Sequence, residues 1–124
     1  MKNKDEQHTI TRLNILSELK HGWLGNDEGE VVKQETINTA RSLLLSLIND
    51  HKLQPFSIYP TPEGHISLEC DLSAYVCEVL IDGSKITGDA LCLDTDETIA
   101  LVIEGDPSKC IADWLMALML SGKE

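Results

Sequence analysis

The chain has 124 residues, 42% of them hydrophobic and 25% charged, a size and composition typical of one globular domain. Its 21 acidic residues outnumber its 10 lysines and arginines, so the net charge at pH 7 is −11. Because nucleic acids and anionic membrane surfaces are bound through clustered lysine and arginine, this balance argues against both as direct partners.

The acidic excess is concentrated in the second half of the sequence. Residues 1–54 carry 7 basic and 8 acidic side chains, whereas residues 55–124 carry 3 basic and 13 acidic side chains. An excess confined to one part of a domain predicts a one-sided negative field, which would steer a basic partner toward that side. The alternative is that the acidic residues only aid solubility.

The sequence predicts a cytoplasmic protein. Its first residues lack the apolar core of a signal peptide, and no apolar run approaches the roughly 20 residues of a membrane span. The four cysteines form no Cys-x-x-Cys pair, and we interpret them as reduced thiols: Cys70, Cys77, Cys92 and Cys110. We expect no cofactor and no structural metal.

Two helices are expected in the first half of the chain. Apolar residues recur every three or four positions over 9–20, where Thr9 is the expected N-cap, and again over 34–51. The glycine-rich residues 21–30 predict a loop between the helices. In this loop Trp23 is expected to be substantially buried at the corner between the two helices.

The middle of the sequence predicts an antiparallel meander. Residues 55–81 contain two runs that alternate apolar and polar side chains and a turn at 61–64, and two further strands are expected at 86–93 and 98–104. The run 99–103 is apolar throughout, which predicts a central strand or one that is covered on both faces.

The last helix is expected to begin with Asp106 as a capping carboxylate and Pro107 at the first helical position, and to stop at Gly122. The predicted fold class is therefore α+β: two N-terminal helices, an antiparallel β-meander of four to five strands and a C-terminal helix packed on the sheet. We interpret residues 9–122 as a single domain behind a disordered tail at residues 1–8.

The C-terminal helix has more apolar side chains than one sheet can cover. A stripe about 100° wide suffices for the core, and four side chains fill it: Ile111, Trp114, Leu115 and Leu118. Met116, Met119 and Leu120 remain outside that stripe. We therefore expect them to form a homodimer interface or to fill the groove of a partner.

Three motifs and a strand between residues 13 and 81 carry a family resemblance. They are Gly-Trp-x-Gly at 22–25, Ala-x-x-Leu-Leu at 40–44, Tyr-Pro-Thr-Pro-x-Gly at 59–64 and the strand Leu68-Glu69-Cys70-Asp71. Together they resemble a family of small acidic proteins of bacteria and mobile elements whose function is unassigned. That family often has an acidic residue in place of Leu24 and tryptophan in place of Cys70. The resemblance implies the helix–helix–meander order and a structural corner at Trp23, and it implies no active site.

Among the side chains of this sequence, the carboxylates come nearest to the pattern of a catalytic site. Glu69 and Asp71 alternate onto one face of a strand, and Glu78 is expected on the neighbouring strand, a type of cluster that metal-dependent hydrolases use. Such sites usually have a lysine beside the carboxylates, and the expected sheet has almost none. Solvated side chains are the simpler interpretation. The serines and histidines do not fit a nucleophilic triad, and the cysteines fit core thiols better than a zinc site.

Two functional hypotheses follow. The first is a non-catalytic interaction module, a small acidic inhibitor or regulator of the immunity, antitoxin or phage anti-defence type, that binds a basic protein surface. The alternative is a metal-dependent hydrolase that uses the three strand carboxylates. In the first hypothesis the partner-binding residues are the strand carboxylates and a group of turn carboxylates: Glu69, Asp71, Glu78, Asp94, Asp96 and Glu97.

Overall fold

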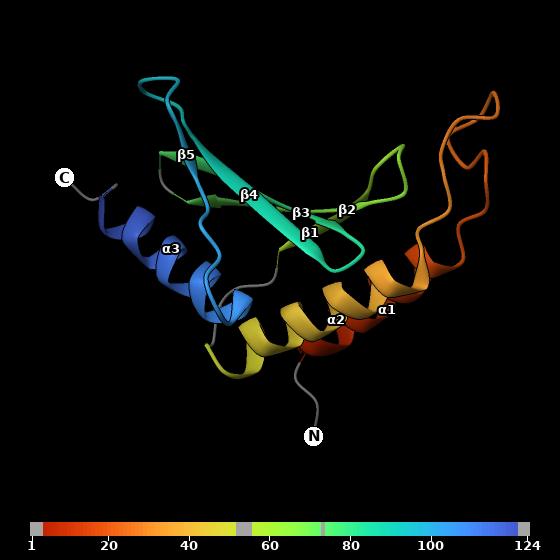
Figure 1. The fold of residues 1–124 in the computed structure, drawn as a ribbon, viewed down its shortest axis with the longest axis horizontal. Coiled ribbons are helices and arrows are strands. Elements are labelled where there is room, and N and C mark those ends of the chain that lie inside the picture. Colours follow the sequence, from red (N-terminus) through yellow and green to blue (C-terminus); the bar gives the residue numbers. More distant parts are fainter. Residues whose placement is uncertain (1–3, 52–55, 73, 122–124) are drawn as a thin grey trace.

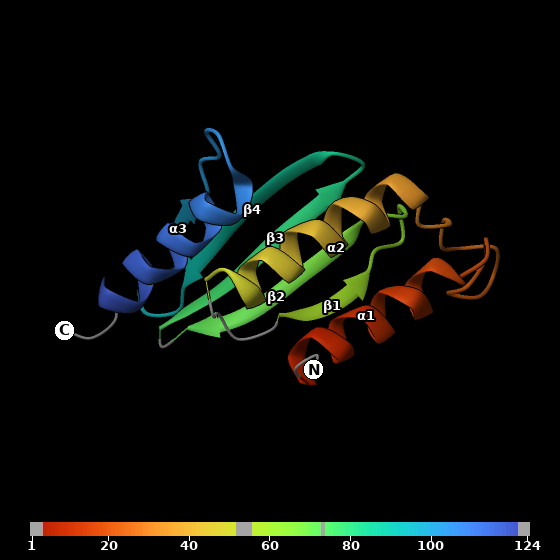
Figure 2. The same ribbon diagram turned by 90° about the horizontal axis from the view of Figure 1, so that it is seen from below.

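The computed structural model describes residues 4–51, 56–72 and 74–121. These residues form three helices and five strands, which lie in two layers (Figures 1 and 2). In chain order the elements are α1 (Lys4–Ser17), α2 (Gln34–Asn49), β1 (Ser57–Pro60), β2 (Ile66–Leu72), β3 (Tyr75–Asp82), β4 (Lys85–Cys92), β5 (Thr98–Ala100) and α3 (Pro107–Ser121).

The five strands form one antiparallel meander. Each strand pairs with the next along the chain, in the order β1-β2-β3-β4-β5. α1, α2 and α3 all lie on the same side of this sheet, and no described helix covers its other face (Figures 1 and 2). The α+β fold expected from the sequence is therefore confirmed.

The core lies between the sheet and the helices. α2 directs a stripe of buried side chains inward at intervals of three or four residues, as its apolar pattern predicts. The strands contribute every second residue, because successive side chains of a strand point to opposite faces. The buried cluster includes Leu13 and Leu16 of α1, Ile37, Ala40, Leu44 and Leu47 of α2, Leu68, Val79 and Ala90 of the sheet, and Ile111, Leu115 and Leu118 of α3.

α1 begins earlier than the sequence analysis expected. It starts at Lys4 rather than Thr9, so residues 4–8 belong to the helix and not to a disordered tail. Lys4, Glu6 and Gln7 are good helix formers, and the charge of Glu6 is favourable near the positive end of the helix dipole. Thr9 is therefore not the N-cap. Its side chain is buried inside the helical layer, and its Oγ1 has no hydrogen-bond partner within the described ranges.

Trp23 lies within its own loop rather than at a buried corner between helices. Its indole Nε1 donates a hydrogen bond to the Glu30 carbonyl oxygen at 2.8 Å, and its ring packs against Gly29. A Cβ on Gly29 would approach the ring to 2.9 Å, so the close contact requires glycine at that position. The ring folds onto its own loop and lies outside the core cluster, so the expected place between the two helices is not seen. The side chain is half-buried.

β5 is shorter and more exposed than the sequence analysis expected. It covers only Thr98–Ala100, pairs with β4 alone, and all three of its residues are exposed. The apolar run 99–103 therefore does not form a central strand. After β5 the chain leaves the sheet toward α3 (Figure 1), and Leu101 packs over Gly88, where a Cβ would lie 3.1 Å from its Cδ2.

α3 begins where the sequence analysis expected. Pro107 is its first residue, and Asp106 Oδ1 accepts a hydrogen bond from the Ser108 backbone N–H at 3.2 Å. The expected stop at Gly122 lies outside the described residues. No helix in the described ranges, α3 included, is long and apolar enough to cross a membrane.

Candidate protein-binding surface

Alternation along the strands divides the sheet into two faces. On β3 the odd-numbered residues from 75 to 81 are buried, whereas the even-numbered residues from 76 to 82 lie on the opposite face. The helices pack only against the first of these faces, which we call the core face (Figures 1 and 2). We call the second the open face, because it is available to a partner.

Three carboxylates stand side by side across the open face. Glu69 on β2 is directly opposite Glu78 on β3, and Glu78 is directly opposite Asp89 on β4. Neighbouring strands lie about 4.8 Å apart, so the three residues form a continuous line across three strands, which we call the acidic row. Like charges at directly opposite positions destabilise a sheet, so the packing of the fold does not explain this arrangement.

Little in the described part of the chain neutralises the acidic row. The Ser67 hydroxyl donates a hydrogen bond to Glu78 Oε2 at 2.8 Å, which orients that carboxylate without removing its charge. The ion pairs in the described part of the chain involve other residues, and Lys85 is the only lysine or arginine in the five strands. The row therefore leaves a concentrated negative charge on the open face.

Small and apolar side chains surround the acidic row. Ser57 on β1 is opposite Glu69, and Ala100 on β5 is opposite Asp89, so the row ends in a short uncharged side chain at each edge of the sheet. The neighbouring rows contain half-buried apolar side chains, namely Val76, Leu80 and Leu91. A partner bound here would meet apolar contact area on both sides of the charged row, whose field would set its orientation.

The six carboxylates predicted to bind a partner do not form one patch. Glu69 and Glu78 are direct neighbours, but Asp71 lies one row further along and is opposite Val76. The other three lie in the turn between β4 and β5, beyond the paired residues of those strands (Figure 1). We call this separate group the acidic turn: Asp94, Asp96 and Glu97.

Asp89 is the member of the acidic row that the sequence analysis missed. Its place follows from the two-residue turn at Gly83 and Ser84, which joins β3 to β4. A two-residue turn sets the register of the hairpin, and this register pairs Glu78 with Asp89. The turn and the alternation of the two strands together contained enough information to place Asp89 on the open face.

The acidic row lacks the geometry of a metal centre. Among the described residues, no group of three or more histidine, cysteine, aspartate or glutamate side chains could hold a metal ion. A hollow of about 160 Å³ lies beside Tyr59, and Glu69 and Asp71 line it, whereas Glu78 does not. The convergence of the three strand carboxylates in one pocket, which the hydrolase hypothesis requires, is therefore not seen in the described part of the chain.

The cysteines are free thiols, and two of them form a pair in the sheet. Cys70 and Cys77 are directly opposite each other on the core face. A hydrogen bond between them raises the pKa of Cys70 and lowers the pKa of Cys77. Cys92 lies further along this face, and a hydrogen bond from the Thr95 side chain lowers its pKa.

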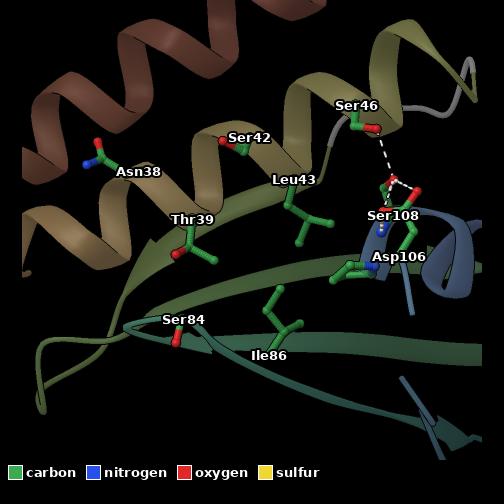
Figure 3. Close-up of a pocket in the computed structure, with 10 residues that line it drawn as sticks. Asn38, Thr39, Ser42, Leu43, Ser46, Ser84, Ile86, Asp106 and Ser108 are labelled. Atoms are coloured by element: carbon green, nitrogen blue, oxygen red, sulfur yellow. Dashed lines mark hydrogen bonds between the residues drawn. The ribbon is translucent and has the colours of Figure 1, made fainter. Parts of the chain in front are cut away.

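A hollow of about 440 Å³ lies between α2, the β3–β4 turn and the start of α3 (Figure 3). At one end Ser46 Oγ lies 2.9 Å from Ser108 Oγ, and the Ser108 hydroxyl donates to Asp106 Oδ1 at 3.1 Å. These polar groups satisfy one another and join α3 to α2. The rest of the lining contains no acid–base pair, and it consists of Asn38, Thr39, Ser42, Leu43, Ser84, Ile86 and Pro107.

α3 exposes the three apolar side chains that lie outside its core stripe. Met116, Met119 and Leu120 are 51%, 37% and 62% exposed, whereas Ile111 and Leu115 of the stripe are buried. The end of α3 extends past the end of the sheet (Figures 1 and 2). The helix therefore presents an apolar surface of its own, at a distance from the open face.

Comparison with known proteins does not assign this surface to a family. The chain matches no family model, no curated protein and no solved structure. Its function is therefore inferred from its own geometry, in which the acidic row on the open face is the most distinctive feature.

Proposed function

We propose that this chain is a non-catalytic interaction module whose open face binds a basic protein surface through the acidic row. The observation that carries the proposal is the direct opposition of Glu69, Glu78 and Asp89 on three neighbouring strands. This opposition destabilises the isolated chain, and lysines or arginines of a partner would offset the repulsion. Binding to a basic partner would therefore explain why three carboxylates lie opposite one another in this sheet.

The charge of the whole molecule supports the same function. The net charge is −11, and residues 55–124, which include the sheet, carry 13 of the 21 acidic side chains. Such a field accelerates encounter with a basic surface, and the acidic turn adds to it. The proposed class is that of small acidic inhibitors and regulators, such as immunity proteins, antitoxins and phage anti-defence proteins, which act by covering a basic site on their target.

The test is affinity capture at low salt with two variants of matched charge. The row variant replaces the three carboxylates of the acidic row with their amides, and the turn variant does the same for the acidic turn. Each variant removes three negative charges, so the two have the same net charge. We expect the wild type and the turn variant to capture a basic partner that the row variant largely loses.

The captured protein is then titrated with each variant by calorimetry at two salt concentrations. We expect the row variant to bind at least about tenfold more weakly than the turn variant, with the difference declining as salt screens the charges. Equal affinities of the two variants would contradict the proposal, because binding would then depend on net charge and not on the position of the carboxylates.

We also propose that the apolar face of α3 mediates self-association. Burying a methionine or leucine side chain contributes about 1.5–3 kcal/mol, and Met116, Met119 and Leu120 are all exposed. Residues 114–121 contain no charged side chain, so association through this segment brings no like charges of the segment into direct contact. A homodimer is therefore the proposed occupant of this face.

Sedimentation at low micromolar concentration tests the homodimer. We expect Met116→Glu/Leu120→Glu to shift the wild-type dimer toward monomer without loss of the fold. Lys109→Glu, at an exposed position on the same helix, makes the net charge more negative by the same two units and should leave the dimer unchanged. A wild type that sediments as a monomer would exclude self-association through α3 at this concentration.

A further inference from the structure

We propose that the free edge of β5 is a strand-addition site for an extended basic segment of the partner. The site would serve the proposed function, on which it rests, because an added strand would lie beside the acidic row. In this arrangement the backbone of β5 supplies pairing and the open face supplies charge. In recognition of an extended peptide at a sheet edge, main-chain hydrogen bonds give affinity and contacts with alternate side chains give specificity.

The opposite edge of the sheet is closed to such pairing. α1 lies alongside β1, and Arg12 Nε donates a hydrogen bond to the Ile58 carbonyl oxygen at 2.8 Å. Pro60, the last residue of β1, has no N–H to donate. A side chain on the backbone and a proline are both devices that prevent edge-to-edge pairing.

β5 has neither a side chain bonded to its outer edge nor a proline, and among the described residues no hydrogen bond is seen to its outward backbone groups. Leu101 N–H donates to the Gly88 carbonyl oxygen at 2.9 Å, and the Glu97 carbonyl oxygen also accepts a hydrogen bond from β4. In an antiparallel ladder, the residues between such positions direct their N–H and C=O groups away from the neighbouring strand. Thr98 and Ala100 therefore present two donors and two acceptors toward solvent, and both residues are exposed.

The side chains of β5 suit a segment that alternates basic and apolar residues. Ile99 is on the core face, opposite Ala90, yet it is 40% exposed, so an apolar side chain of an added strand would cover it. Ala100 is on the open face, opposite Asp89. An added strand would lie about 10 Å from β4, and the small Ala100 leaves room for a long lysine or arginine stem to extend toward Asp89.

A second copy of this chain fits the edge less well than a basic segment. Pairing of β5 with itself would bring the acidic turns and Glu104 of two chains together, each chain having a net charge of −11. β5 carries no charge of its own, so nothing on it repels a basic strand. The acidic row attracts such a strand, and we therefore assign the edge to the basic partner.

The test uses two synthetic peptides of equal charge. The probe is acetyl-Lys-Val-Lys-Val-Lys-Val-Lys-amide, which places lysine on one face and valine on the other when extended. The control carries an N-methyl group on the backbone nitrogens of its three central residues, which removes the donors that could face β5 in either strand direction and leaves the charge unchanged. We expect the probe to bind about tenfold more tightly than the control, and to protect the Thr98 and Ala100 amides from hydrogen exchange.

Substitutions at Ala100 separate the contribution of backbone pairing to peptide binding from the contribution of charge. Ala100→Pro removes an N–H that points away from β4, so the ladder between β4 and β5 keeps its own hydrogen bonds. The affinity of this variant for the probe should fall to the affinity of the wild type for the control peptide. Ala100→Ser retains the N–H and should bind the probe as the wild type does. Thermal melting checks that both variants are folded.

Three outcomes would overturn strand addition, and they separate it from the proposed function. If both peptides bind equally and the row variant loses both, binding depends on charge alone and the proposed function stands. If neither peptide binds at low salt, the proposed function is contradicted as well. If the wild type is a dimer that Ala100→Pro converts to a monomer, a second copy occupies the edge.

Discussion

The two faces of the sheet act on the stability of the fold in opposite directions. Leu68 and Glu69 are consecutive on β2, yet Leu68 is fully buried on the core face and Glu69 belongs to the acidic row on the open face. Burial on the core face stabilises the fold, whereas repulsion on the open face destabilises it. The face on which a residue lies, rather than its position along the chain, therefore decides what a substitution does.

The largest effect is expected on the core face. Leu68→Ala should lower the free energy of unfolding by about 3 kcal/mol, because it removes buried methyl groups and leaves a cavity. Urea denaturation measures this change. Glu69→Ala, at the next residue, is the matched control and should change stability by less than about 0.5 kcal/mol. Similar losses for the two variants would contradict the division of the sheet into two faces.

A smaller effect of opposite sign is expected on the open face. Glu78→Gln should raise the free energy of unfolding by roughly 0.5 kcal/mol at low salt, because Glu78 has a carboxylate opposite it on both sides. Glutamine keeps an oxygen that can accept the Ser67 hydrogen bond. The gain should fall as salt increases. Glu63→Gln, in the exposed turn between β1 and β2, is the control and should have no such effect.

Local sequence patterns predicted the elements in which buried residues recur with the period of a helix or of a strand. The α2 stripe and the alternation on β3 follow from the spacing of apolar residues, and the fold class followed from them. β5 was different. An apolar run indicates that burial of its side chains would be favourable, but it does not show that another strand or helix lies next to it. The chain leaves the sheet after Ala100 to reach α3, and Ile99 remains exposed.

The candidate site was predictable only in part, for a similar reason. Alternation placed Glu69 and Glu78 on one face, and the Gly83–Ser84 turn would have added Asp89 through the hairpin register. The closed edge at β1 was not predictable, because Arg12 reaches the Ile58 backbone across 46 positions of sequence. Contacts of that range depend on how α1 lies against the sheet, which no local pattern specifies.

The smallest effect distinguishes two thiols that share the core face. Cys77 is fully buried on β3, whereas Cys92, at the end of β4, is partly exposed. Hydrogen bonds lower the pKa of both, from Cys70 in the first case and from the Thr95 side chain in the second. Exposure therefore decides which thiolate can react, and iodoacetamide at pH 7 should modify Cys92 and leave Cys77 unmodified in the folded protein.

The rate of alkylation at Cys92 then shows whether the hydrogen bond from Thr95 stabilises its thiolate. A lowered pKa increases the thiolate fraction at neutral pH, so the curve of alkylation rate against pH should rise at lower pH than it does for an ordinary cysteine. Thr95→Val removes the hydroxyl, which raises the pKa of Cys92, slows alkylation at pH 7 and moves the curve toward higher pH. Thr98→Val, a similar substitution on β5, is the control and should leave the curve in place. Identical curves for Thr95→Val and the wild type would show that the Thr95 hydroxyl does not stabilise the thiolate, and that exposure alone distinguishes the two cysteines.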